Sequence, residues 1–176
     1  MAGVTTQMVK ELRERTGAGI KECRDILMQT NGDLNAAIDE LAKRGLRVSE
    51  KVQGREAREG RIEVYMHAGN RMAAMVELNC ETDFVARTED FIALAKDIAL
   101  QIAAMNPRDI RPEDVPEEEL KASGESPEKF YEANVLMAQY FVRDGAQTIE
   151  DKIKATVAKV RENIVVSRFV RYEIGA

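Results

Sequence analysis

The sequence predicts an α+β protein, with an N-terminal three-helix module and a core domain in which helices pack on a three-stranded antiparallel sheet. Apolar residues recur at helical spacing through residues 4–45. Between residues 61 and 80 they alternate on both sides of a turn, and residues 164–174 form a further Val-rich run. These patterns predict helices in the N-terminal part of the chain and a small sheet in the part that follows.

Residues 4–45 are expected to form three short amphipathic helices. Gly17-Ala18-Gly19 ends the first, and Asn31-Gly32-Asp33 separates the second from the third, with its Asp as a helix N-cap. Gly45 is expected to follow the last residue of the third helix. A core shared by three short helices is marginally stable alone.

Residues 46–60 lose this pattern and intersperse acidic with basic side chains. We therefore predict a solvated linker at 51–60, between a module at 1–50 and a core domain at 61–176. The alternative is a basic strip for an acidic partner, and the interspersed acids argue against it.

The clearest hairpin lies at residues 61–80, where Gly69-Asn70 forms a two-residue turn. This turn pairs Ala68 with Arg71 and His67 with Met72. Apolar residues alternate along both strands, so we expect one face of the hairpin to be apolar throughout. The alternating residues are Ile62, Val64, Met66, Met72, Ala74, Val76 and Leu78.

A helix that begins after Thr88 is predicted to cover that face, because its apolar residues follow helical spacing. All four prolines fall within residues 107–127, an acidic stretch that we interpret as an exposed connector. A helix is expected from Ser126-Pro127 to about Asp144-Gly145, and another from Thr148.

The third antiparallel strand is predicted at Ile164–Ile174, completing the sheet. Its alternating apolar residues are expected on one face: Val166, Val170, Tyr172 and Ile174.

Composition limits the possible functions. The 176 residues carry 31 acidic and 26 basic side chains, a net charge of −5, whereas nucleic-acid binding needs a basic surface. No apolar run approaches the roughly 20 residues that span a bilayer. The two Cys and single His provide neither a disulfide framework nor a zinc site. We expect a soluble, cytoplasmic protein that docks another protein, with no direct contact to nucleic acid or membrane.

Candidate enzymatic groups are few. A nucleophile–base pair would need Cys80 beside His67. Cys80 lies eight residues beyond Met72, the predicted partner of His67, so at about 3.3 Å per residue the two are ~26 Å apart. We therefore expect Cys80, like Cys23, to be a small buried hydrophobe.

Three neighbouring carboxylates, those of Glu77, Glu81 and Asp83, could transfer protons or bind Mg²⁺. No pocket-forming pattern surrounds them, so we interpret them as solvated surface charge. Arg15–Lys21 is rich in Gly but lacks the spacing and the preceding strand of a phosphate-binding loop. No metal site or cofactor is predicted.

The junction between the second strand and the following helix places Phe84 beside Asp83. Such junctions lie at the surface and often carry binding residues. Phe84 is either a core residue at a corner or an exposed anchor for a partner, and the residue pattern leaves both open.

Three segments in the same order resemble the elongation factor Ts family. The most specific is Glu77-Leu78-Asn79-Cys80-Glu81-Thr82-Asp83-Phe84-Val85-Ala86-Arg87. The second runs from Val9 to Gly19, with Ile20, Cys23 and Leu27 following it, and the third is Glu162-Asn163-Ile164. The single core copy resembles the short form of the family.

This resemblance implies a guanine nucleotide exchange factor for elongation factor Tu, not an enzyme, acting in translation elongation. It makes residues 1–50 a ubiquitin-associated-like module, and it favours Phe84 as an anchor inserted near the Mg²⁺ and phosphate site of the GTPase. The partner-binding residues implied are Thr82, Asp83, Phe84 and Val85 of the loop, and Arg13, Ile20 and Lys21 of the module.

The resemblance also implies binding to both GDP-bound and nucleotide-free elongation factor Tu, without a cofactor. A homodimer through the core domain is expected, giving a 2:2 complex. The alternatives are an adaptor whose helical module binds ubiquitin-like or nascent chains and, more remotely, an enzyme that uses Cys80.

Overall fold

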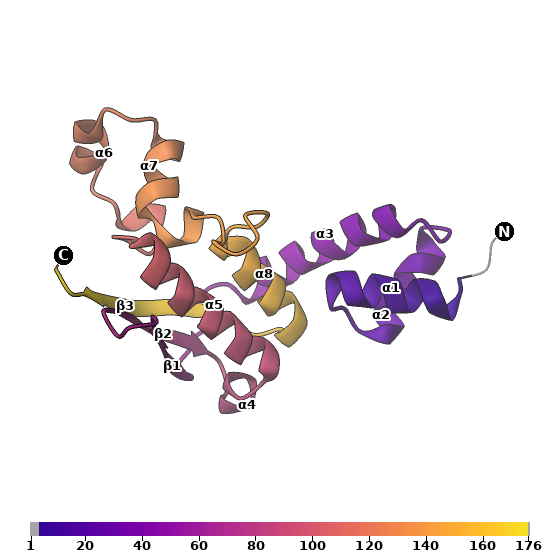
Figure 1. The fold of residues 1–176 in the computed structure, drawn as a ribbon. Helices are drawn as coiled ribbons and strands as arrows, with labels where there is room; N and C mark the ends of the chain where they lie inside the picture. The colour runs from indigo at the N-terminus through magenta and orange to yellow at the C-terminus, as the bar shows by residue number, and fades with distance from the viewer. Residues whose placement is uncertain (1–3, 176) are drawn as a thin grey trace. The chain divides into compact units, whose positions relative to one another are not determined.

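The computed structural model describes residues 4–175 and combines helices with a three-stranded antiparallel sheet, which confirms the α+β class (Figure 1). The chain divides into two compact units. The first runs to Gln53 and includes Val157–Arg161, and the second comprises Gly54–Thr156 and the chain from Glu162 onward.

The first unit begins with three helices that share one core: α1 (Thr6–Thr16), α2 (Ile20–Gln29) and α3 (Leu34–Val52). The Asp33 side chain caps α3, and Gly17 ends α1 with a left-handed φ of 69°, as predicted. The buried residues of this core are Leu12, Cys23, Ile26, Leu27, Ala37 and Leu41.

The end predicted for the third helix is wrong. Gly45 lies inside α3, which continues to Val52. Gly disfavours a helix interior by only about 1 kcal/mol relative to Ala, and the buried Val52 lies in the last turn. Lys51 and Val52 are therefore helical, Glu59 and Gly60 are in a strand, and only residues 53–58 of the predicted linker are irregular.

The sheet of the second unit has the order β1 (Glu59–Met66), β2 (Met72–Cys80) and β3 (Val165–Glu173), antiparallel throughout. The His67 amide donates to the Met72 carbonyl at 2.9 Å, which confirms the predicted hairpin register. Gly69 and Asn70 both have positive φ, as a two-residue hairpin turn requires.

The prediction of one apolar hairpin face is wrong. Val76 pairs with Glu63, and Met75 pairs with Val64. Directly paired residues share a face, so Ala74, Val76 and Leu78 are buried on the inner face while the apolar residues of β1 lie on the outer face. Ile62 is 60% exposed there.

β3 also divides its apolar residues between the two faces. Leu78 pairs with Val166, whereas Glu77 pairs with Arg168, so a β-bulge interrupts the register. An extra residue reverses which face the later side chains occupy. The predicted single apolar face is therefore wrong: Val166 is buried on the inner face, and Tyr172 lies on the outer face with Val170.

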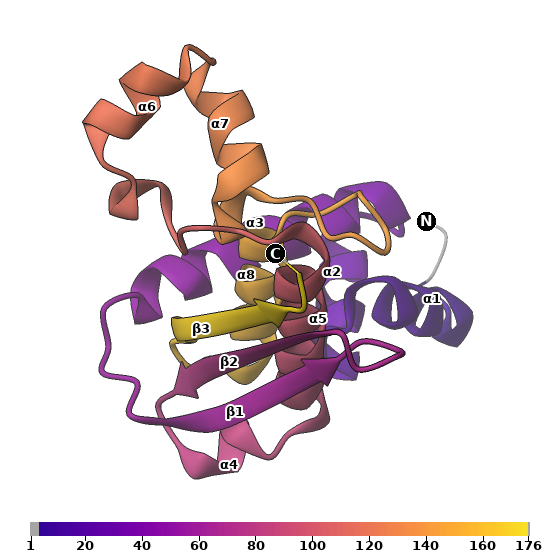
Figure 2. The same ribbon diagram turned by 60° about the vertical axis from the view of Figure 1, so that its left-hand side comes forward.

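Helix α5 (Glu89–Met105) covers the inner face, behind the sheet in Figure 2. It begins directly after Thr88, as predicted, and the Thr88 side chain caps it. Among the described residues, no helix crosses the outer face, which is turned toward the viewer in Figure 2. The short helix α4 (Asp83–Ala86) lies between β2 and α5 in the chain.

The connector carries a 3₁₀ turn at Pro112–Asp114 and a helix, α6 (Glu117–Ser123). Helix α7 (Pro127–Asn134) begins at the predicted Ser cap but ends about ten residues early, before a 3₁₀ turn at Leu136–Ala138. The Asn134 carbonyl accepts hydrogen bonds from the Arg108 and Asp109 amides. These distant partners replace the helical ones.

Helix α8 (Ile149–Val160) leads toward the last strand. The Thr148 amide donates to the Asp151 carboxylate, and the Asp151 amide donates to the Thr148 hydroxyl, both at 3.1 Å. This reciprocal pair is a capping box at Thr148, where the sequence predicts that the helix begins. Among residues 4–175, no helix is long and apolar enough to cross a membrane.

Candidate functional site

The candidate site is the junction where β2 ends at Cys80 and α4 begins at Asp83. Thr82 has extended backbone geometry, and its hydroxyl accepts a hydrogen bond from the Val85 amide at 3.4 Å. This is an N-cap, which satisfies one of the free amides at the start of the helix. The sequence Thr-Asp-Phe-Val therefore folds as a single capped turn.

Phe84 projects from this turn into solvent and is 79% exposed. The alternative of a core residue at a corner is therefore wrong. Val85 is half-buried, and Ala86 is buried. The turn thus anchors its following residues in the protein and leaves the aromatic ring outside.

Asp83 lies beside this ring in the first turn of α4. Its Oδ2 atom pairs with Arg87 Nη2 at 2.8 Å, one helical turn later. Both side chains are well exposed, so water screens the pair and its contribution to stability is small. Asp83 remains accessible to a partner.

The Glu162 carboxylate, just before β3, receives three hydrogen bonds from the junction. Its Oε2 accepts from the Glu81 amide at 3.1 Å and from the Thr82 amide at 3.0 Å, and its Oε1 accepts from the Thr82 hydroxyl at 2.7 Å. These contacts join residues about 80 positions apart in the chain.

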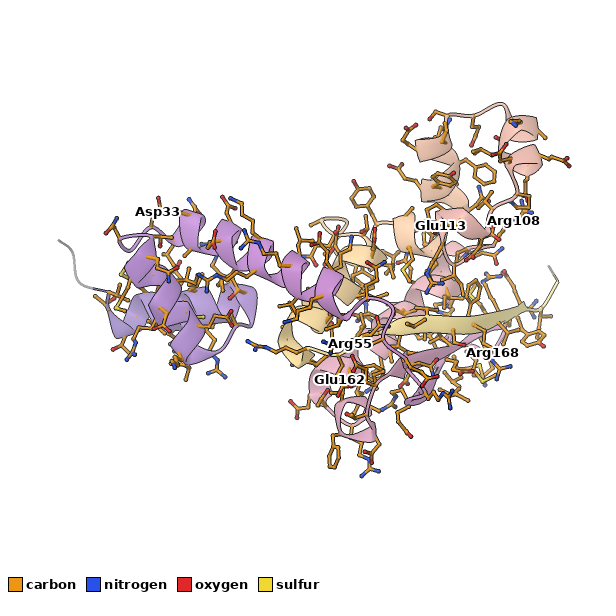
Figure 3. The ribbon with its side chains drawn as sticks, turned by 180° about the vertical axis from the view of Figure 1, so that it is seen from behind. Asp33, Arg55, Arg108, Glu113, Glu162 and Arg168 are labelled. Atoms are coloured by element: carbon orange, nitrogen blue, oxygen red, sulfur yellow. The ribbon has the colours of Figure 1, made fainter. Side chains whose placement is uncertain are left out.

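Glu81 completes the connection in the opposite direction. Its Oε1 accepts a hydrogen bond from the Asn163 amide at 2.7 Å and lies 3.6 Å from Arg55 Nη1. The Asn163 side chain in turn donates to the Arg55 carbonyl at 2.7 Å. Figure 3 shows Arg55 and Glu162 at the same end of the sheet. Interpreting Glu81 as a solvated charge was therefore wrong.

The other two carboxylates of that predicted group have separate partners. Glu77 Oε2 lies 2.7 Å from Arg168 Nε on the outer face, and this hydrogen bond lowers the pKa of Glu77. Asp83 pairs with Arg87. The three carboxylates thus form no shared acid–base or metal site.

Cys80 is fully buried beneath the junction, and its thiol lies 3.1 Å from the Thr82 carbonyl, to which it donates. Burial, and then the negative charge of Glu162, raise the pKa of Cys80 to about 11. A thiol with so high a pKa is a poor nucleophile at neutral pH. His67 lies opposite Met72, near the other end of the strand, so a Cys–His pair is excluded.

The three module residues are exposed on the other compact unit. Arg13 lies in α1, and Ile20 and Lys21 form the first turn of α2. Ile20 is unusually exposed for an apolar residue, at 61%. The structure thus presents two separate surfaces, with Thr82–Val85 on one unit and these three residues on the other.

The remaining candidate groups, for a metal ion and for phosphate, are dispersed in the part of the chain that the structure describes. No three His, Cys, Asp or Glu side chains there gather as a metal site. Gly17 and Gly19 connect two helices and follow no strand, unlike a phosphate-binding loop.

Sequence reasoning missed the connecting residues Arg55, Glu162 and Asn163 as parts of the site. Glu162-Asn163 entered only through family resemblance. The predicted pairing of the last strand with the hairpin contained the missing signal, because antiparallel pairing brings the start of β3 to the end of β2. Side chains that precede β3 can therefore reach the junction that follows β2.

The chain is similar to proteins of one family throughout its length. The family model "Elongation factor TS" matches residues 3–127. Elongation factor Ts of Caldanaerobacter subterraneus subsp. tengcongensis is 44% identical over 194 residues, covering 98% of this chain and 97% of the relative. Elongation factor Ts of Herpetosiphon aurantiacus is 45% identical over 195 residues, covering 98% of each.

A third relative, elongation factor Ts of Thermodesulfovibrio yellowstonii, is 46% identical over 193 residues, with 98% of this chain and 96% of the relative covered. Identity at this level over nearly the whole of both chains shows common ancestry. The chain belongs to the elongation factor Ts family, a family of translation elongation factors.

Proposed function

We propose that this protein is a guanine nucleotide exchange factor for elongation factor Tu, promoting GDP release in the cytoplasm. Family membership supports the process and the partner. The observation that carries the proposal is Phe84, an exposed aromatic ring on a turn held by polar contacts. Burying such a side chain in a partner contributes about 1.5–3 kcal/mol, which favours docking.

In the proposed mechanism Phe84 inserts into the GTPase near its Mg²⁺ and phosphate-binding site, and Asp83 makes the adjacent polar contact. Thr82 and Val85 shape the loop. The displaced GTPase groups hold Mg²⁺ and the β-phosphate less well, so GDP leaves faster and abundant GTP replaces it. This protein transfers no proton and needs no cofactor.

Thermodynamic linkage fixes one property of this mechanism. If the factor weakens GDP binding, GDP weakens binding of the factor by the same ratio. The factor therefore binds the nucleotide-free GTPase more tightly than the GDP-bound form, and it leaves when nucleotide binds again.

The helical module supplies a second contact in this proposal. Residues 1–50 act as a ubiquitin-associated-like module that binds the GTPase through Arg13, Ile20 and Lys21, while residues 61–176 form the core domain. Exposed Ile20 supports an apolar contact, with the cationic Arg13 and Lys21 available for acidic groups. Two contacts on one chain raise the effective concentration of the second.

We further propose a homodimer through the outer sheet face, giving a 2:2 complex. Ile62, Val64, Met66, Met75 and Tyr172 are all exposed on this face. The Glu77 and Arg168 charges on this face already pair with each other within the chain. A second copy presents the same apolar surface about a two-fold axis, and two sheets pack face to face at about 10 Å.

The exchange mechanism is tested by stopped-flow release of a fluorescent GDP analogue from elongation factor Tu. The unmodified protein should accelerate release strongly, and Phe84→Ala should lose most of that acceleration. Tyr140→Ala removes another exposed aromatic side chain and serves as the matched control. No acceleration by the unmodified protein would refute the function, whereas full acceleration by Phe84→Ala would refute the insertion mechanism alone.

A further inference from the structure

We propose that Glu162 is a positioning residue for nucleotide exchange, which fixes the turn that presents Phe84. The inference rests on the proposed function and assigns a role to a side chain outside the partner-binding loop. Glu162 does not itself contact the partner in this proposal. It acts by holding Glu81 and Thr82, the residues from which the turn begins.

Glu162 satisfies three donors of the junction. β2 ends at Cys80 and α4 begins at Asp83, so Glu81 and Thr82 belong to neither element. The Glu162 carboxylate accepts from both of their amides and from the Thr82 hydroxyl. Hydrogen bonds to an ionised acceptor are stronger than neutral ones, and three of them converge on this carboxylate, so the contact fixes the backbone direction at the junction.

The Thr82 hydroxyl contacts both Glu162 and the first turn of α4. This hydroxyl donates its single proton to Glu162 Oε1 and accepts from the Val85 amide with a lone pair. Glu162 therefore determines the orientation of the group that caps α4. Phe84 lies two residues after Thr82, so the position of its ring depends on this cap.

Helix α4 has only four residues. A helix of four residues cannot be stable by itself, because starting a helix fixes several dihedral angles for one hydrogen bond. External contacts must hold the turn. When Glu162 releases Thr82, the turn loosens and the Phe84 ring must be ordered again during docking, which weakens binding.

A second pair of contacts makes the connection reciprocal. Glu81 accepts from the Asn163 amide while Glu162 accepts from the Glu81 amide, so each acidic residue holds the segment of the other. Arg55 reinforces this arrangement through the Glu81 carboxylate and the Asn163 side chain. The junction is thereby restrained on two sides, leaving the exposed Phe84 ring outside the network.

The chemistry also explains why Glu suits this position. A carboxylate offers two acceptor oxygens, and both are used here. Gln has the same length but offers only one acceptor oxygen, and its amide NH₂ group would face a donor. Asp keeps the charge on a shorter side chain. Glu162→Gln therefore removes one acceptor oxygen at constant length, whereas Glu162→Asp keeps both oxygens and shortens the side chain.

The test compares GDP release by the unmodified protein with that by Glu162→Gln, Phe84→Ala and the double variant. Glu132→Gln, the same change at an exposed Glu of α7, is the control. We expect Glu162→Gln to lower the efficiency of release about tenfold, from a less ordered docking residue. In the Phe84→Ala background the same change should have almost no further effect, because both act through one ring.

Amide hydrogen exchange of the free protein gives a readout that needs no partner. In Glu162→Gln the Glu81 and Thr82 amides should exchange faster, while the β2–β3 amides keep their protection. If all amides lose protection, Thr82→Val provides a second route, since it removes the hydroxyl contact and leaves Glu162 in place. It should slow release, again only when Phe84 is present.

The outcomes separate the two proposals. If the unmodified protein fails to accelerate GDP release, the proposed function fails. If it accelerates release and Glu162→Gln does so equally well despite faster exchange of the Glu81 and Thr82 amides, the positioning role is overturned. Additive losses in the double variant would also overturn it, because Glu162 would then act through the general stability of the fold.

Discussion

Two surfaces of the second compact unit expose apolar side chains, in opposite ways. At the junction one ring, Phe84, projects from a four-residue turn in which Asp83 is paired, Val85 is half-buried and Ala86 is buried. The outer sheet face spreads exposed apolar side chains over three strands, from Ile62 on β1 to Tyr172 on β3.

The difference agrees with the two kinds of interface proposed above. A single fixed ring suits a pocket that is entered and left in each cycle, because it concentrates binding energy in one residue. A wide, flat apolar face suits a lasting interface, which is typically larger and more apolar. Four changes to the protein or its solution test this difference, and their expected effects decrease from the first to the last.

The largest effect is expected for Phe84→Ala, and only on exchange. Truncating a central anchor costs about 2 kcal/mol or more, or ~30-fold in binding of the exchange intermediate. Because the ring is exposed, the free energy of unfolding should change by less than about 0.5 kcal/mol. Urea denaturation beside stopped-flow kinetics measures both. A large loss of stability would show that the ring is part of the core.

On the outer sheet face, an introduced charge should weaken dimerisation. Met75 lies on the central strand, so Met75→Glu places an unpaired charge in the middle of the proposed interface. The dimer dissociation constant should rise about tenfold or more. Light scattering should show twice the 19.7 kDa chain mass for the unmodified protein and approach the single mass for the variant.

Met28→Glu is the matched control, because Met28 is also exposed, at 57%, and lies on α2. A monomeric mass for the unmodified protein at micromolar concentration would contradict the dimer. Retained dimer in Met75→Glu would place the interface on another surface.

Alkaline pH should loosen the junction through Cys80. Its pKa is raised from 9.0 to about 11, so folding favours the protonated thiol. This contribution to the free energy of unfolding is fully present below about pH 9 and is lost as pH rises from about 9 to about 11. The loss reaches about 1 kcal/mol at pH 10. Denaturation at pH 8 and pH 10 measures it. Cys80→Ala should lack this component, and identical pH dependence in both proteins would refute it.

The smallest effect is expected for Arg87→Ala. The pair of Arg87 with Asp83 is exposed and separated by one helical turn, so its loss should cost about 0.5 kcal/mol or less. GDP release should remain close to that of the unmodified protein. A loss as large as that of Phe84→Ala would make Arg87 a partner contact and widen the anchor beyond one ring.

In the hairpin, the register predicted from the turn was correct, but the faces predicted for its side chains were wrong. The turn at Gly69-Asn70 gave the correct register from sequence. That register pairs even-numbered with odd-numbered residues, so Val64 and Val76 had to lie on opposite faces. The expectation of one apolar face contradicted it. The outer face was thus predictable from the turn, whereas the bulge that divides β3 was not.

Features that depend on neighbouring residues, such as the helix caps, could be predicted from the sequence alone. Asp33, Thr88 and Ser126 cap helices because each side chain reaches an amide two or three positions later. The capped turn at Thr82 belongs to the same class. Such interactions depend on spacing alone, so a pattern read along the chain is enough.

The tertiary structure decided what distant residues do to one another. α7 ends where Asn134 meets Arg108 and Asp109, and Glu81 becomes a structural ligand because Asn163 donates to it. Thr82, which caps the turn that carries Phe84, is likewise held by Glu162, a residue that lies just before another strand. Satisfying a polar group requires a partner at hydrogen-bond distance, and only the folded chain determines which partner that is.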